Sequence, residues 1–339
     1  GGDGDSLLNL AIGWAVDSVG PKVVWVEVDS LAINDSVYMR AGVKIIGNKT
    51  PVYVTGAITV FYDSTTGGAA WFETEGFDFY GDANVVAIWH GHHLTDSLII
   101  TDCRVLNASG AAFTTFAVDD SSDSWQVTNL QVLNSEQLLW GGQYSTFLNC
   151  VMRTEALAAA SDDFPWRVHG DNNRLIGCKL VKLDGTLAGA ILTISELGDG
   201  VTAAGIQIID FIMQIEDSTN AWALYVDGTV TNGLIDGFVT PKQPSGRIMM
   251  DNGIGFSVAG CNGWVVKNAY IFGARVEGFT DYGDNDFWSN CHVENSAVGI
   301  HFYTGAVKSG YDLISVHTVT TNSTDAGTST VLGNIRDLD

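Results

Sequence analysis

Charged, histidine and tyrosine residues alternate with apolar residues in six short segments of this chain. The segments are FAVDD, FPWRVHG, LTISE, WALYVDG, ARVEG and GIHFYTG. Alternate side chains of a strand point to opposite faces, so Trp222, Val276 and the other apolar residues are expected inside and the polar ones outside. On an exposed face, carboxylates and histidines can transfer protons, and arginines can hold a carboxylate with two hydrogen bonds.

Stacking these segments in chain order predicts two outward columns of side chains. The first column contains Asp119, His169, Ser195, Asp227, Ala259, Glu277 and Tyr303, and the second contains Arg167, Thr193, Tyr225, Ser257, Arg275 and His301. Adjacent strands lie about 4.8 Å apart, so the backbones of Asp227 and Glu277 are expected about 10 Å apart. The catalytic candidates are Asp227, Glu277, His169 and Arg275. The substrate-binding candidates are Arg167, Tyr225, His301, Tyr303 and Asp119.

The elements that position these residues recur along the chain. Nine segments place a small polar residue or Gly between two short apolar runs, at Asp102, Asn129, Asn149, Gly177, Asp210, Asp236, Asn268, Asn290 and Ser315. These anchors are separated by about 27 residues on average, less than the ~30 residues of a strand–helix–strand unit. Asn, Asp and Gly tolerate left-handed torsions at a tight bend. The spacing therefore predicts an all-β solenoid with about ten to twelve coils.

The cysteines follow the same repeat. Four of the five, Cys103, Cys150, Cys178 and Cys291, come directly after an anchor, at a position that is otherwise mostly small or apolar. This position is expected to point inward, so the cysteines are expected to be buried free thiols in one column. An odd number also excludes a complete disulfide framework.

The chain is strongly acidic, with 39 acidic and 16 basic residues and a formal net charge of −23. This charge disfavours nucleic acid as a partner, and it makes a highly charged uronate polymer a harder fit. No run approaches the ~18 apolar residues of a membrane span, so no membrane-spanning segment is expected. The opening GGDGD does not resemble a signal peptide, which is compatible with a cleaved signal or with a piece of a longer protein.

The N-terminal segment differs from the repeats. SLLNLAIGWAVDSV, from Ser6 to Val19, has apolar residues at helical spacing and Ser6 as a candidate N-cap. A helix here would cap the exposed end of the solenoid. We predict a capping helix and first strands over residues 1–42, the solenoid over 43–320, and a tail or last coil over 321–339.

This helix, the following VVWVEVDSLAINDSVYMRAGVKIIGN, and the repeats to about residue 320 together resemble the pectate-lyase-like superfamily. The resemblance implies a single-stranded, right-handed parallel β-helix. It also implies a glycan groove on the strand that precedes each GCNG- or GDNN-type turn. That superfamily includes lyases, hydrolases, epimerases and phage tailspike depolymerases, and some members only bind. The chain lacks the lyase-type run of Asp followed by Arg. It also lacks the hydrolase-type paired Asp, unless Asp119-Asp120 replaces it.

Three functions follow as alternatives from this resemblance. The first is tailspike-like hydrolysis of a cell-surface or extracellular polysaccharide, with Asp227 and Glu277 approaching the about 6.5–9.5 Å separation of inverting glycosidases. The second is a lyase, in which Arg167 with His169, or Arg275 with His301, binds a uronate carboxylate and removes the neighbouring proton. The third is a non-catalytic adhesin or structural spike. Resemblance to tailspikes also implies a homotrimer and an extracellular or virion-surface location.

No metal or cofactor is expected, with Ca²⁺ as the alternative because acidic side chains cluster in three places. The clusters are Asp119-Asp120 with Asp123, Asp162-Asp163, and Asp281 with Asp284 and Asp286. His90, His92 and His93 could ligate a transition metal, but no further ligands at suitable spacing complete a set. These histidines are therefore interpreted as surface or turn residues.

Overall fold

The computed structural model describes residues 4–63, 71–81, 85–91, 97–107, 114–118, 124–133, 143–154, 166–182, 188–195, 203–216, 220–242, 249–256, 260–304, 306–327, 330 and 333–337. The chain forms two compact units, Gly1–Ala158 (unit 1) and Ala159–Asp339 (unit 2). The boundaries expected near residues 42 and 320 stay a prediction. Each unit consists of short parallel strands in successive coils, so the predicted right-handed parallel β-helix is confirmed.

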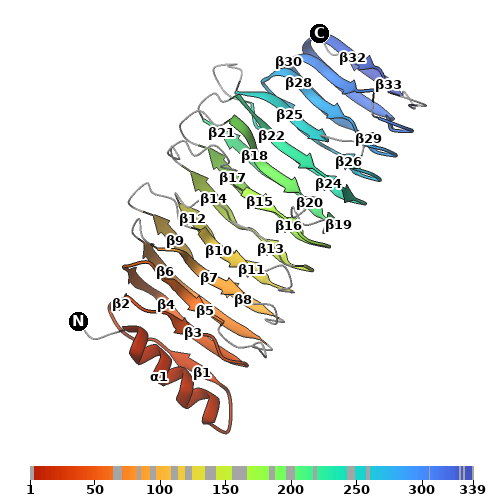
Figure 1. Ribbon diagram of the computed structural model, residues 1–339. Helices are drawn as coiled ribbons and strands as arrows, with labels where there is room; N and C mark the ends of the chain where they lie inside the picture. The colour runs from red at the N-terminus through yellow and green to blue at the C-terminus, as the bar shows by residue number, and fades with distance from the viewer. Residues whose placement is uncertain are drawn as a thin grey trace. The chain divides into compact units, whose positions relative to one another are not determined.

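Unit 1 combines one helix with strands that pair in parallel from coil to coil (Figure 1). Its elements are α1 (Gly4–Asp17), β1 (Val23–Trp25), β2 (Leu31–Ile33), β3 (Val37–Tyr38), β4 (Val43–Val54), β5 (Thr59–Tyr62), β6 (Phe72–Gly81), β7 (Ala87–Gly91), β8 (Leu98–Thr101), β9 (Arg104–Asn107), β10 (Thr114–Val118), β11 (Gln126–Thr128), β12 (Gln131–Leu133), β13 (Thr146–Leu148) and β14 (Val151–Thr154). One face carries β1, β4, β6, β8, β11 and β13 in that order. A second carries β2, β4, β6, β9, β12 and β14, and a third carries β3, β5, β7 and β10.

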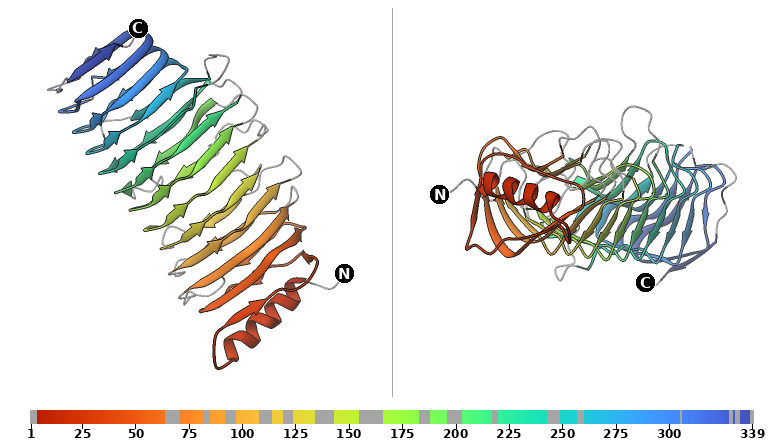
Figure 2. Two further views of the ribbon diagram at one scale, coloured as in Figure 1. Left: turned by 180° about the vertical axis from the view of Figure 1, so that it is seen from behind. Right: turned by 90° about the horizontal axis from the view of Figure 1, so that it is seen from below.

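The helix α1 lies against the first coil at the N-terminal end of unit 1 (Figure 2), which agrees with the expected cap. It buries Leu8 and Ile12, and Asn9 ties it to the first coil by donating to the Ser36 carbonyl and accepting from the Tyr38 amide, at 3.0 and 2.8 Å. The helix begins at Gly4, so Ser6 lies inside it and the predicted N-cap is wrong. In the described part of the chain, no helix has the length and hydropathy that a membrane span requires.

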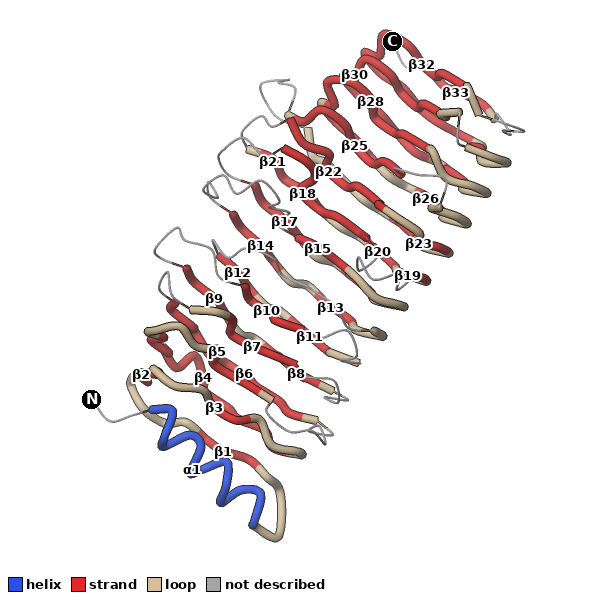
Figure 3. Tube along the Cα trace, in the orientation of Figure 1, coloured by secondary structure: helices blue, strands red, loops and turns tan. Residues whose placement is uncertain are grey.

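The described part of unit 2 consists of strands and loops (Figure 3). Its strands are β15 (Trp166–Val168), β16 (Arg174–Ile176), β17 (Lys179–Lys182), β18 (Ala188–Ser195), β19 (Ala203–Ala204), β20 (Gln207–Ile209), β21 (Ile212–Ile215), β22 (Asn220–Asp227), β23 (Val230–Thr231), β24 (Leu234–Asp236), β25 (Met250–Phe256), β26 (Val265–Lys267), β27 (Tyr270–Phe272), β28 (Ala274–Asp281), β29 (Phe287–Ser289), β30 (Cys291–Phe302), β31 (Gly310–Tyr311), β32 (Leu313–Asp325) and β33 (Asn334–Asp337). One face carries β15, β18, β22, β25, β28, β30 and β32, and we call its outer surface the β15–β32 face. A second face carries β16, β20, β24, β26, β29 and β31.

The predicted bends are confirmed at seven of the nine anchors. Asp102, Asn129, Asn149, Gly177, Asp210, Asn268 and Asn290 have left-handed φ angles between 50° and 62°. Their side chains also bond from coil to coil, with Asn129 donating to Asp102 and Asn290 to Asn268, both at 2.8 Å. Two anchors are wrong. The left-handed residue is Gly237 instead of Asp236, and Ser315 lies within the continuous strand β32.

The cysteines are buried free thiols, as the repeat predicts. Burial raises the pKa of Cys103 and of Cys291 to about 12 in both cases, because the interior disfavours a thiolate. The thiols at these two positions therefore contribute to packing and stay protonated at neutral pH.

Candidate functional site

The strand register determines which side chains share a row on the β15–β32 face. Arg167, Thr193, Tyr225, Gly255, Thr280 and His301 lie in one row across β15, β18, β22, β25, β28 and β30. The predicted order of Arg167, Thr193, Tyr225 and His301 is therefore confirmed in register, but Thr193 was expected outside and is buried. The predicted members Ser257 and Arg275 are wrong, since Gly255 and Thr280 hold those places. The side chain of Arg167 lies outside what the structure describes.

The predicted placement of Asp227 and Glu277 in one column is wrong. Glu277 is in register with Asn252, and Asn252 with Trp222, which precedes Asp227 by five residues. At about 3.3 Å per residue, this offset is about 16 Å along the strands, in addition to two strand spacings across them. The two carboxylates are therefore too far apart to serve as the acid and base of one glycosidic bond.

An irregularity in β28 explains this error. Met250 pairs with Ala274, but Asn252 pairs with Glu277, so β28 contains one extra residue between these two points. Such a bulge interrupts the alternation of side chains. Val276, which was expected inside, is consequently 43% exposed. A strict period of two cannot reveal an extra residue inside a strand.

The strands β28 and β30 bring Glu277, His301 and Tyr303 into contact. Glu277 Oε1 lies 2.6 Å from His301 Nδ1 and accepts a hydrogen bond from the Tyr303 hydroxyl at 2.9 Å. Thr280 Oγ1 donates to Glu277 Oε2 at 2.6 Å. Glu277 is only 5% exposed, so its carboxylate interacts with these three side chains instead of with solvent.

Aromatic rings cover one side of this cluster. The Tyr303 ring stacks on His301, with centroids 3.6 Å apart, and on Tyr282, with centroids 3.9 Å apart. Burial raises the pKa of Tyr303, and its hydrogen bond to Glu277 raises that pKa further, so the phenol keeps its proton at neutral pH. Tyr282 was not among the sequence candidates, because it lies after the strand segment ARVEG that supplied them.

The hydrogen bond from His301 Nδ1 to a carboxylate decides which nitrogen can do chemistry. A neutral imidazole that donates from Nδ1 has its lone pair on Nε2. His301 Nε2 has no hydrogen-bond partner among the described residues, and 20% of the side chain is exposed. Glu277 therefore orients His301, and Nε2 is available to accept a proton from a ligand on this face.

Trp222 lies on the same face, although the alternation predicted it inside. Its ring contacts the ring of Tyr225 at 5.2 Å and covers Gly255, where a Cβ atom would collide with it. Gly255 is in turn in register with Thr280, the partner of Glu277. The prediction failed because Ala223 and Leu224 are both buried, which shifts the alternation by one residue.

The remaining candidates are separate from this cluster. His169 was expected outside but is 1% exposed, and its Nδ1 lies 2.8 Å from the Ser195 carbonyl oxygen. Arg275 forms an ion pair with Asp251 at 2.5 Å. Asp227 is exposed and accepts a hydrogen bond from its neighbour, the Gly228 amide, at 3.0 Å. Asp119 lies outside the described residues. The catalytic and binding roles of these residues stay predictions.

In the third acidic cluster, Asp281 and Asp286 are buried in the interior of unit 2. Asp281 accepts from the Trp288 indole and the Gly283 amide, at 2.9 and 2.7 Å, and Asp286 accepts from the Trp264 amide at 2.7 Å. Burial raises the pKa of both carboxyl groups above the ordinary range, and the charge of Asp281 raises the pKa of Asp286 further. Among the described residues, no three His, Cys, Asp or Glu side chains are grouped to hold a metal ion. The other two clusters, and His92 and His93, lie outside those residues.

Comparison with known proteins supports the fold. No protein-family model matches the chain, and no curated protein sequence does either. The A-module of mannuronan C-5 epimerase AlgE6 from Azotobacter vinelandii is structurally similar, with a TM-score of 0.64 and 12% identity over 99% of this chain and 96% of that one. The chain therefore shares the parallel β-helix fold of this module. The tailspike protein of Acinetobacter phage vB_ApiP_P1 gives a TM-score of 0.55 at 10% identity over the whole of this chain, which spans 59% of the tailspike. Identities this low show the fold alone.

Proposed function

We propose that this protein binds and cleaves an extracellular polysaccharide on the β15–β32 face, with His301 as the proton-transfer group. The observation that carries the proposal is the 2.6 Å contact between Glu277 Oε1 and His301 Nδ1. It orients an imidazole on a partly exposed strand face beside stacked aromatic rings. The similarity in fold to a mannuronan epimerase supports a polysaccharide as the substrate class.

The reaction that suits this arrangement is elimination next to a uronate carboxylate. His301 Nε2 would take the proton beside the carboxylate, and the electron pair left behind would form a carbon–carbon double bond. The glycosidic carbon–oxygen bond would break, and its oxygen would leave as a hydroxyl after taking up a proton. Arg275, the expected lyase partner of His301, forms an ion pair with Asp251 and does not share the row of His301, so it has no part in this proposal.

Hydrolysis by Asp227 and Glu277 is the weaker version of the proposal. Their register separates them, and three donors occupy the oxygens of Glu277. A binding spike without catalysis is the second candidate function. The Trp222–Tyr225 pair favours it, because half-buried aromatic rings on a strand face can pack against a sugar in the absence of any reaction. A homotrimer outside a cell or on a virion belongs to this proposal as well, and fold similarity to a tailspike supports it.

The test is incubation with neutral and uronate-containing polysaccharides, following reducing ends and the ultraviolet absorbance of unsaturated products together. We expect absorbance and reducing ends to rise in parallel, and to be lost in His301→Asn. Asp227→Asn is the matched control and should stay active. Reducing ends without absorbance, lost in Asp227→Asn, would instead establish hydrolysis. Binding without either product would establish the spike.

A further inference from the structure

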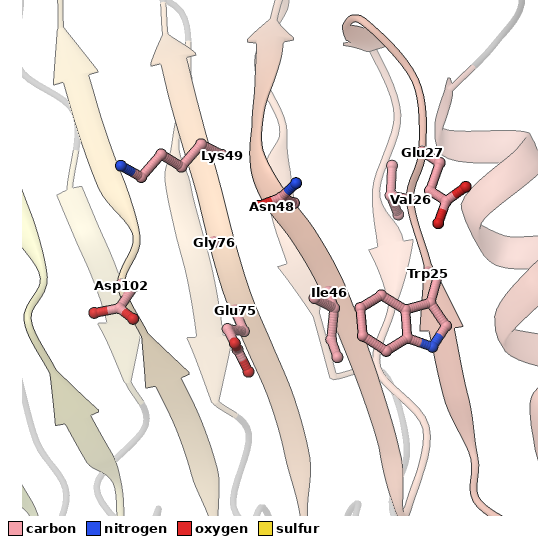
Figure 4. A pocket seen from close by; sticks show the side chains of 9 residues that line it. All are labelled: Trp25, Val26, Glu27, Ile46, Asn48, Lys49, Glu75, Gly76 and Asp102. Carbon is pink, nitrogen blue, oxygen red and sulfur yellow. The ribbon is translucent and has the colours of Figure 1, made fainter.

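Unit 1 contains a cavity, and none of the residues discussed above for catalysis is among those that line it. Its volume is ≈ 320 Å³, and its lining comes from β1 and the two residues after it, from β4 and β6, and from Asp102 directly after β8 (Figure 4). Trp25, Glu27, Asn48, Lys49, Glu75 and Asp102 supply its aromatic and polar surface. A second cavity of ≈ 480 Å³ shares Lys49 and Asp102 with it and continues past Arg104 and Asn129. Small-molecule sites commonly occupy about 300–1,000 Å³, so both are large enough for a ligand.

The strand register arranges the floor of the first cavity as a row. Trp25 pairs with Ile46, Ile46 with Glu75, and Glu75 with Thr101, so the row crosses β1, β4, β6 and β8. Three strand spacings make this row about 14 Å long. Trp25 stands at one end with 65% of its side chain exposed, beside Ile46 (Figure 4). The row therefore offers an aromatic ring at one end and polar groups at the other.

A local insertion places Lys49 over this row. The register of β4 and β6 shifts between Ile46 and Thr50, so that Gly47, Asn48 and Lys49 all lie opposite Gly76. Asn48 and Lys49 adopt left-handed φ angles of 44° and 63°. For a residue such as Lys this conformation is strained and usually persists only where the surrounding structure enforces it. The insertion directs the Lys49 side chain across Gly76 toward Asp102, which directly follows β8 (Figure 4).

The charges of the cavity indicate the kind of ligand. Lys44 is paired with Glu73 and Glu75, at 2.7 and 2.5 Å, and Arg104 is paired with Asp78. Lys49 has no carboxylate partner among the described residues, while Glu27 and Asp102 have no cationic partner among them. Carboxylates thus outnumber the unpaired cation. An anionic ligand would be repelled, whereas hydroxyl groups can donate to carboxylates and accept from an ammonium group.

We infer that this cavity is a second glycan-binding site, which takes an uncharged sugar segment and is separate from the β15–β32 face. Trp25 provides the ring against which a sugar face packs. Lys49 donates to sugar oxygens, and Glu27 and Asp102 accept from sugar hydroxyls. This inference does not depend on the proposed reaction, because none of these residues belongs to the Glu277 cluster.

Isothermal titration of the full chain with cello-, malto-, manno- and xylo-oligosaccharides, and with oligogalacturonate as the carboxylated probe, tests the inference. We expect at least one neutral probe to bind and oligogalacturonate to bind more weakly. Trp25→Ala should weaken binding about tenfold, equivalent to about 1.4 kcal/mol. Hydrogen exchange of β4 and β6 should slow when the neutral probe is bound.

Matched controls come from the chain itself. Trp14 is 68% exposed on α1 outside the cavity, so Trp14→Ala should bind as the wild type does. Lys308 is exposed and left-handed, with φ of 57°, so Lys308→Ala is the control for Lys49→Ala. Lys49→Gly, which suits a left-handed φ, replaces Lys49→Ala if the latter unfolds.

The inference would be overturned by failure of every neutral probe to bind, by undiminished binding in Trp25→Ala, or by tighter binding of oligogalacturonate than of any neutral probe. Loss of binding in Trp222→Ala with retention in Trp25→Ala would also overturn it, because the probe would then occupy the β15–β32 face. Cleavage assays of the same variants report separately on the proposed function.

Discussion

The outer surfaces of the two units use their charged side chains in different ways. In unit 2, Glu277 is buried and every oxygen is held by a neighbour, so its charge acts through His301. In unit 1, Lys49, Glu27 and Asp102 line an open cavity, and Lys49 has no carboxylate partner among the described residues. An oriented, desolvated pair suits proton transfer, whereas solvent-facing groups around a Trp suit binding. One type of coil can thus support both proton transfer and binding. The extra residue in β28 sets the position of Glu277, and the insertion in β4 sets the position of Lys49.

The largest effect is expected from His301→Asn. Loss of a positioned proton-transfer group typically costs about 10²–10⁴-fold in rate. We expect kcat to fall by that amount while binding of neutral oligosaccharides by unit 1 is unchanged, which steady-state kinetics and titration can measure side by side. A parallel loss of both properties would show that the two surfaces are not independent.

Glu277→Gln sharpens the same comparison, because it removes the charge and keeps the shape. An amide in place of the carboxylate no longer favours an Nδ1–H tautomer of His301, so we expect kcat to fall about 10²-fold with little change in KM. The pH profile of kcat should shift as well. A variant with unchanged kcat and pH profile would reduce Glu277 to a structural residue.

Trp222→Ala tests the aromatic part of the β15–β32 face. Aromatic contacts contribute about 0.5–1.5 kcal/mol beyond burial, so we expect KM to rise about tenfold with kcat nearly unchanged. The comparison variant is Trp25→Ala, which should weaken neutral-sugar binding and leave cleavage intact. Equal effects of both variants on cleavage would contradict the division of roles.

Asp286→Asn should change the pH dependence of stability and leave both surfaces active. Burial and the charge of Asp281 raise the pKa of Asp286 on folding, so the unfolding free energy of the wild type falls as the pH rises above 3.8, the ordinary pKa of this carboxyl group. Asn still accepts from the Trp264 amide and carries no charge. We therefore expect calorimetry at about pH 8 to give a higher Tm for this variant than for the wild type, and the Tm of the variant to depend less on pH.

Asp281→Asn is the control for that experiment, because Asp281 accepts with both oxygens, from Trp288 and Gly283. An amide can accept with only one of them, so this variant should be less stable than the wild type at every pH. Stabilisation by Asp281→Asn would mean that these hydrogen bonds contribute less than the burial of charge costs.

The smallest effect is expected from Asp227→Asn. The register places Asp227 about 16 Å along the strands from the level of Glu277, so activity should stay within about twofold of the wild type. Steady-state kinetics on the polysaccharide cleaved by the wild type provide the measurement. A loss as large as that in His301→Asn would restore the two-carboxylate interpretation.

The sequence by itself determined the repeating architecture. Asn, Asp and Gly at about 27-residue spacing predicted the bends, because few other residues tolerate left-handed torsions at low cost. The apolar position after each bend predicted the buried cysteines, and alternation placed Tyr225, His301 and Tyr303 outside. These are local properties, which depend on each residue and its near neighbours.

Only the tertiary structure decided which outward side chains meet. One extra residue in β28 moved Glu277 out of the column of Asp227 and against His301. The insertion in β4 placed Lys49 over Glu75 and Gly76, residues that follow it by more than twenty positions. The register of a parallel strand depends on its partner in the next coil, and sequence periodicity cannot detect a shift of one residue. Such a shift changes which side chains come together to form a site.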